Sequence, residues 1–73
     1  MKYDMIYEAL TSCYSQNEAV EILEQLNKNE LLEFAIEYGY LVDNSYSKYE
    51  IIHEIVLEEI VFPLLKDIEA IFN

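Results

Sequence analysis

Residues 47–56, with the sequence SKYEIIHEIV, contain the clearest helix signal in this chain of 73 residues. Ser47 and Glu50 have the spacing of a capping box, in which the serine hydroxyl accepts from the Glu50 amide and the glutamate side chain reaches back to the Ser47 amide. Aliphatic residues then recur at three- and four-residue spacings. The stretch therefore predicts a long helical region. Pro63 should kink it near Val61 and Phe62, because proline lacks the amide hydrogen and crowds the preceding turn.

Two shorter helices are predicted near the N-terminus. The first should run from about Tyr3 to about Tyr14, because apolar residues recur there at helical spacing. Its expected core face is Met5, Ile6, Ala9, Leu10 and Cys13. Ser15-Gln16-Asn17-Glu18 is a second predicted capping box, and its helix should extend to about Leu26. The core face expected there is Ala19, Val20, Ile22, Leu23 and Leu26.

A third helix is expected from Glu30 to Tyr38, after the polar break Asn27-Lys28-Asn29 and with Asn29 as its N-cap. Gly39 should end it, because glycine adopts the left-handed conformation without steric cost. Tyr40-Leu41-Val42 is expected to be extended or a loop, and Asp43-Asn44-Ser45 a turn. Since glycine and proline occur once each, the predicted fold is all-α, a single domain over residues 1–73 with four to five short helices.

Acidic residues dominate the charge of the chain. Fifteen Asp and Glu residues face four basic residues, all lysines, and the formal net charge is −11. Such a charge destabilises a compact state through self-repulsion. The hydrophobic content of 53%, with seven tyrosines and three phenylalanines, is not that of a disordered acidic tail. The charge therefore either keeps an apolar small protein in solution or forms a surface for a positively charged partner.

Carboxylates repeat at helical spacing within three of the predicted helices. The rows are Glu18, Glu21 and Glu24; Glu30, Glu33 and Glu37; and Glu50, Glu54 and Glu58. Neighbouring side chains in such a row lie about 5–6 Å apart, a spacing similar to that of phosphates along one DNA strand. Few lysines stand where they could offset the repulsion. This pattern favours a DNA-like surface aimed at a cationic groove, with simple solubility as the alternative.

Apolar residues after Ser47 are too dense for a single amphipathic face. Besides the residues that face the core, a second set of apolar residues recurs at alternating spacings of four and three. This set, called the apolar seam below, consists of Leu57, Val61, Leu64, Ile68 and Ile71. Either the short helices wrap this segment on most sides, or the seam is a subunit interface. A short chain with one cysteine and one histidine has no disulfide or conventional structural zinc to stabilise it. We therefore expect a homodimer.

Residues suited to catalysis or metal binding are sparse. Glu50, His53 and Glu54 have a spacing that could hold a metal, but a binuclear site needs a matching set on another helix. A solvated helix face is the favoured interpretation. Cys13 has no neighbouring base in the sequence, so its thiol should stay protonated and half-buried. We expect no enzymatic activity, no cofactor and no metal.

The sequence also bears on the compartment. The N-terminus lacks the basic start and apolar core of a signal peptide. Charged residues interrupt the apolar stretch 51–72, so it should not span a bilayer. Together with the lone cysteine, these features predict a cytoplasmic protein.

Two segments resemble a known type of module. Residues 31–39 (LLEFAIEYG) look like the first helix and glycine stop, and residues 47–55 (SKYEIIHEI) like the second helix, of helix–extended loop–helix modules of the SAP, LEM and Rho N-terminal type. The resemblance, over residues 30–56, implies that fold and nucleic-acid binding through basic residues. This surface keeps only Lys48 among carboxylates, so nucleic-acid binding is not expected here.

The chain as a whole is similar in style to a class of viral inhibitors. Its length, its lack of arginine and its dense acidic helices resemble bacteriophage-encoded inhibitors of sliding clamps, nucleoid proteins, DNA-repair glycosylases and nucleases. The resemblance implies a DNA mimic that inhibits a basic DNA-binding protein in the bacterial host cytoplasm, with the nine glutamates of the three rows as its binding surface. The alternative is a non-catalytic interaction or regulatory module that acts through the apolar C-terminal seam.

Overall fold

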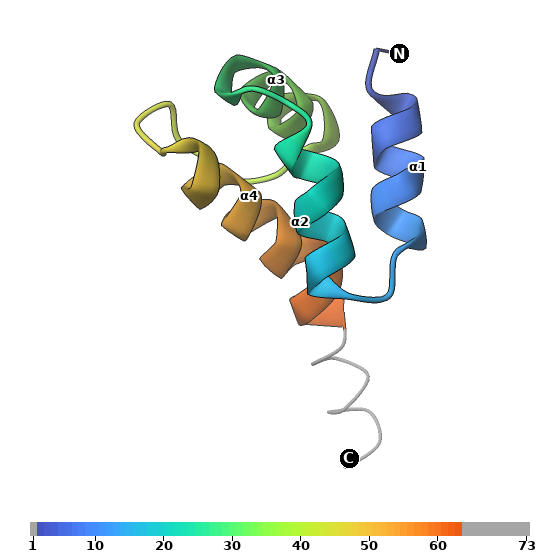
Figure 1. Ribbon diagram of the computed structural model, residues 1–73. Coiled ribbons are helices and arrows are strands. Elements are labelled where there is room, and N and C mark those ends of the chain that lie inside the picture. The colour runs from blue at the N-terminus through green and yellow to red at the C-terminus, as the bar shows by residue number, and fades with distance from the viewer. Residues whose placement is uncertain (1, 64–73) are drawn as a thin grey trace.

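Helices make up most of the part of the chain that the computed structural model describes, residues 2–63, and no strand occurs there (Figure 1). The α-helices are α1 (Asp4–Ser12), α2 (Gln16–Glu24), α3 (Lys28–Tyr38) and α4 (Lys48–Val56). A π-helical segment, η1 (Leu57–Val61), continues α4. The predicted all-α class is confirmed. No helix within the described range is both long and apolar enough to cross a bilayer.

The helices enclose one core. In Figure 1, α2 lies between α1 and α4, and α3 lies across the end of the bundle where α1 begins. Phe34 of α3, Leu23 of α2, and Ile51 and Ile55 of α4 are fully buried. The predicted core face of α2 is confirmed, since its five apolar positions are buried or partly buried.

The buried face of α1 differs from the predicted one. Leu10 is fully buried and Tyr3 is only 4% exposed, whereas Met5 is 83% exposed and Ala9 is also exposed. The rings of Tyr3 and Tyr7 lie 5.9 and 6.5 Å from the Phe34 ring, centroid to centroid. Aromatic rings bury more apolar area than the side chains of methionine or alanine. The expectation that Met5 and Ala9 face the core was therefore wrong.

Serine caps start α2 and α4. Ser15 Oγ accepts from the Glu18 amide at 3.2 Å, and Ser47 Oγ accepts from the Glu50 amide at 3.2 Å. Glu50 Oε1 completes the box by accepting from the Ser47 amide at 3.0 Å. For Ser15, the described contacts contain only the first bond of the predicted pair. The capping box at Ser47 is thus confirmed and that at Ser15 is half formed.

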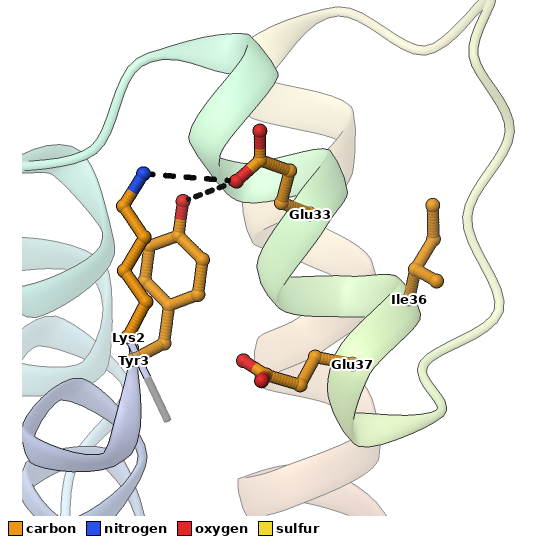
Figure 2. A pocket seen from close by; sticks show the side chains of 5 residues that line it. All are labelled: Lys2, Tyr3, Glu33, Ile36 and Glu37. Atoms are coloured by element: carbon orange, nitrogen blue, oxygen red, sulfur yellow. Dashed lines mark hydrogen bonds and ion pairs between the residues drawn. The ribbon is translucent and has the colours of Figure 1, made fainter.

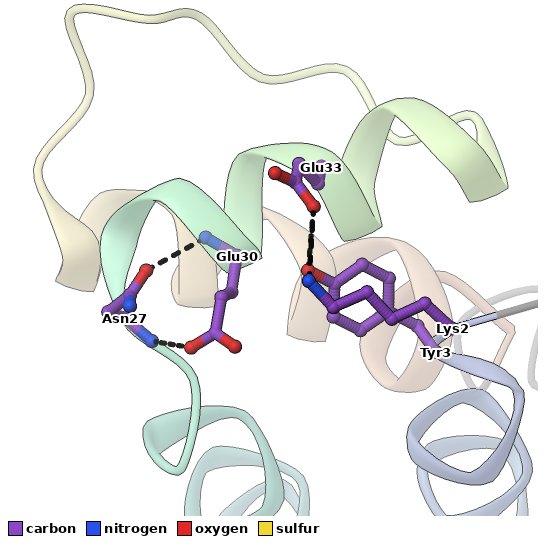
Figure 3. A network of polar contacts seen from close by, with 5 residues as sticks. All are labelled: Lys2, Tyr3, Asn27, Glu30 and Glu33. Atoms are coloured by element: carbon purple, nitrogen blue, oxygen red, sulfur yellow. Dashed lines mark hydrogen bonds and ion pairs between the residues drawn. The ribbon is translucent and has the colours of Figure 1, made fainter.

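Asn27, not Asn29, caps α3. Its Oδ1 accepts from the Glu30 amide at 2.9 Å, and Glu30 Oε1 accepts from the Asn27 amide at 3.0 Å (Figure 3). The predicted cap was wrong because a capping box needs an acceptor three residues after the cap. Glu30 fills that position for Asn27, whereas Asn29 would place apolar Leu32 there. Gly39 ends the helix as predicted, with φ of 78° in the left-handed region.

Replacing Asn27 by alanine should lower the free energy of unfolding by about 1 kcal/mol, because the first turn of α3 loses its side-chain acceptor. Asn29→Ala, inside the same turn and exposed, should change it by less than about 0.5 kcal/mol. Urea denaturation followed by far-ultraviolet circular dichroism measures both. Equal losses in the two variants would contradict the assigned cap.

The segment η1 continues the helical region of α4 as far as Val61, two residues before Pro63. The Phe62 amide donates to the carbonyl of Leu57, five residues back, as in a π-helix. This wider turn comes directly before a residue that cannot continue an α-helical ladder. The predicted kink depends on the course of the chain beyond Pro63, which lies outside the described residues, so it stays a prediction.

Candidate functional site

Of the three acidic rows, the one in α2 has the fewest contacts with other described residues. Glu18, Glu21 and Glu24 are all exposed, and none of their carboxylates has a hydrogen bond or ion pair with another described residue. Lys48 approaches α2, but its Nζ donates to the backbone carbonyl of Glu24 at 3.0 Å rather than to a carboxylate. The row therefore presents its charge directly to solvent.

The α3 row is partly engaged within the protein. Glu30 belongs to the capping box with Asn27. Glu33 Oε2 accepts from the Tyr3 hydroxyl at 2.9 Å and lies 3.8 Å from Lys2 Nζ (Figures 2 and 3). Glu37 is partly buried, and its Oε2 is buried without a hydrogen-bond partner among the described residues. Two of the three members thus hold the fold as well as carrying charge.

The third row, Glu50, Glu54 and Glu58, runs from α4 into η1 and is also partly engaged within the protein. Glu50 belongs to the capping box with Ser47, and Glu54 and Glu58 are partly buried. Glu50 and Glu54 also line a cavity of about 290 Å³ together with Tyr46, Tyr49 and His53. The nine predicted glutamates therefore differ in exposure and in hydrogen bonding. Only the three in α2 are all exposed and have carboxylates without a partner among the described residues.

Tyrosine hydroxyls hold carboxylates at three places. Besides Tyr3 on Glu33, Tyr38 donates to Asp4 Oδ1 at 2.6 Å and Tyr40 donates to Glu59 Oε1 at 2.8 Å. The bond to Asp4 raises the pKa of Tyr38 to about 12 and lowers that of Asp4. Burial and the bond to Glu59 raise the pKa of Tyr40. Each carboxylate gains a donor that stays neutral, so its negative charge is kept.

These pairs were missed from sequence. The partners are 30, 34 and 19 residues apart, and no local pattern connects them. The one available signal was the combination of seven tyrosines with few lysines. It indicates that neutral hydroxyls must supply donors that lysines do not.

Two further candidates from the sequence are a metal site at Glu50, His53 and Glu54 and the thiol of Cys13. The described residues contain no group of three or more His, Cys, Asp and Glu side chains placed to hold a metal. Cys13 is half-buried as predicted, and its Sγ donates to the Leu10 carbonyl at 2.9 Å. Burial, followed by Glu18 and Glu59, raises the pKa of its thiol. A thiol in this state is a poor nucleophile.

The predicted dimer seam is described only in part. Leu57 and Val61 are partly exposed, and Phe62 beside them is 47% exposed. The other three seam residues, Leu64, Ile68 and Ile71, lie outside the described residues. The homodimer stays a prediction.

An open cavity of about 310 Å³ lies between the start of the chain and α3 (Figure 2). Lys2 and Tyr3 form one side and the α3 residues Glu33, Ile36 and Glu37 the other. It contains two members of the α3 row. No sequence pattern marked it, because its walls are about 30 residues apart along the chain.

Comparison of the chain with protein-family models, curated proteins and solved structures finds no match. The helix–loop–helix of α3 and α4 has the element order that the SAP-type resemblance implies, and the resemblance itself stays a prediction.

Proposed function

We propose that this protein is a DNA mimic that binds and inhibits a basic DNA-binding protein of a bacterial host, such as a sliding clamp, a nucleoid protein or a nuclease. The observation that supports this proposal most is the α2 row, whose three exposed carboxylates have no hydrogen-bond or ion-pair partner among the described residues. Like charges one helical turn apart repel one another. A groove lined with lysines and arginines would offset that repulsion, because each carboxylate would be attracted to a nearby positive charge.

The tyrosine–carboxylate bonds support the same proposal. A protein that needed its acids only for solubility could pair them with lysines, whereas here one lysine–carboxylate ion pair, Lys2 with Glu33, joins the described residues. Hydroxyl donors stabilise the fold and leave the surface potential negative. Such a potential steers a basic partner into encounter and weakens with added salt. Inhibition follows because the bound protein occupies the groove that DNA would enter.

The test starts from a pull-down from bacterial lysate at low and high salt, with the captured proteins identified by mass spectrometry. A basic DNA-binding protein should be retained at low salt and released at high salt. Its affinity is then measured for the wild-type chain and for E21Q/E24Q. We expect the double variant to bind about tenfold more weakly, from about 0.7 kcal/mol for each exposed ion pair. Substitutions in the α3 row are less suitable, because Glu30 and Glu33 support the fold.

A charge-matched control separates the arrangement of charges from their sum. E21Q/E24Q/N29E/N44E restores the net charge at two exposed positions outside α2. It should bind as weakly as E21Q/E24Q if the row itself is recognised. If the quadruple variant regained full affinity, or if the double variant lost none, the α2 row would not be the recognised surface. The acidic residues would then serve solubility. Loss of binding on changes at Leu57 and Val61 instead would favour the alternative, an interaction module acting through the apolar seam.

A further inference from the structure

The open cavity formed by Lys2, Tyr3, Glu33, Ile36 and Glu37 has room for one long side chain (Figure 2). Its volume of about 310 Å³ is at the lower end of the roughly 300–1,000 Å³ usual for small-molecule sites. Ile36, which is 74% exposed, gives it an apolar wall. Two carboxylates one helical turn apart give it a polar one.

Glu37 has a carboxylate oxygen without a partner among the described residues, and its side chain lines this cavity. Its carboxylate extends from α3 towards Tyr3 (Figure 2), and its Oε2 is buried with no donor among the described residues. A buried carboxylate oxygen without a donor is unfavourable. A cationic N–H group is the partner that relieves it best, because charge-assisted hydrogen bonds are the strong ones.

Lys2 shows which chemistry the cavity accepts. Its Nζ lies 3.8 Å from Glu33 Oε2 and 5.3 Å from the centroid of the Tyr3 ring (Figure 3). The chain thus places its own ammonium group at the Glu33 end, close to a carboxylate and to an aromatic ring. At the Glu37 end, the described residues supply no cation.

We propose that the cavity receives one arginine side chain of the basic partner, with its guanidinium group against Glu37 and Glu33 and its methylene stem along Ile36. Arginine fits better than lysine because its planar group has five donors and can serve two carboxylates at once. Its stem packs on apolar surface while the charged head stays polar. The identity of the partner rests on the proposed function, whereas the cavity can be tested without any partner.

The test uses blocked arginine, N-acetyl-L-arginine methylamide, titrated into the full chain at low salt and followed by amide chemical shifts. Saturable shifts should centre on Tyr3, Ile36 and Glu37. Glu37→Gln should weaken binding about tenfold, since a charge-assisted hydrogen bond is lost. Glu8→Gln makes the same charge change at an exposed position of α1, outside the cavity and the three rows, and should leave the affinity unchanged. Equal weakening by the two variants would overturn the proposal.

Lysine variants give a second readout that leaves α3 intact. Lys2→Gln should tighten the binding of blocked arginine, because it removes the competing ammonium, whereas Lys28→Gln makes the same charge change away from the cavity and should not. Equal effects would overturn the proposal, as would blocked lysine binding as tightly as blocked arginine.

The two proposals fail in different ways. If a basic partner loses affinity for E21Q/E24Q but not for Glu37→Gln, the cavity proposal is overturned and the proposed function stands. If the chain binds blocked arginine at the cavity but captures no basic protein, the proposed function is overturned and the cavity is supported alone.

Discussion

Replacing Phe34 by alanine is expected to lower the free energy of unfolding by about 3–5 kcal/mol, which is enough to unfold much of a domain this small. Phe34 is fully buried, and its ring meets several tyrosines at once. The centroid distances are 5.9 Å to Tyr3, 6.5 Å to Tyr7, 5.1 Å to Tyr38 and 5.7 Å to Tyr40. Alanine would leave a cavity where α1, α3 and the loop after α3 meet.

The matched control is Ile36→Ala, two residues further along α3. Ile36 is an apolar side chain of similar helix context but is mostly exposed, so its truncation should change stability by less than about 0.5 kcal/mol. Urea denaturation, followed by tyrosine fluorescence and far-ultraviolet circular dichroism, measures both variants. If both variants lost a similar amount of stability, the contacts between Phe34 and the surrounding tyrosine rings would not be the centre of the core. The Ile36 variant also removes one wall of the arginine cavity without disturbing the fold.

Replacing Leu10 by alanine should lower the free energy of unfolding by about 2–5 kcal/mol. Leu10 is the fully buried side chain of α1, and α1 packs on α2. The loss should be felt first in α1, because a terminal helix can detach while the rest of the core persists. Amide hydrogen exchange should therefore show faster exchange over Asp4–Ser12 than over α4.

Met5→Ala is the control for Leu10→Ala, because both residues were expected in the core from sequence. Met5 is largely exposed, so its truncation should be close to neutral. If Met5→Ala destabilised the protein as much as Leu10→Ala, the rotation of α1 that buries its tyrosines would be incorrect. A neutral Met5→Ala with a destabilising Leu10→Ala would support it.

Helix starts and stops could largely be predicted because they depend on neighbours in the chain. Ser47 and Glu50 are three residues apart, and their two hydrogen bonds form wherever a helix begins there. Gly39 ends α3 for an equally local reason, its positive φ. The error at Asn29 was also local, since the acceptor position of Glu30 selects Asn27.

The candidate site was predictable only as a set of charges. Spacing placed glutamates in rows on the helices, and the exposed α2 row is as expected. Spacing does not say that Glu33 meets Tyr3, or that one oxygen of Glu37 becomes buried without a partner. Those outcomes depend on how α1 and α3 pack.

The amino-acid sequence by itself determined the helical class, the caps, the stop at Gly39 and the excess of carboxylates. All of these follow from composition or from hydrogen bonds within one helical turn. Only the tertiary structure decided which side of α1 is buried, which carboxylates are held by tyrosines and where the cavity lies. The physical reason is separation along the chain. Hydrogen bonds between Tyr3 and Glu33 or between Tyr38 and Asp4 span 30 and 34 residues, so they exist only once packing of the aromatic rings has brought α1 and α3 together.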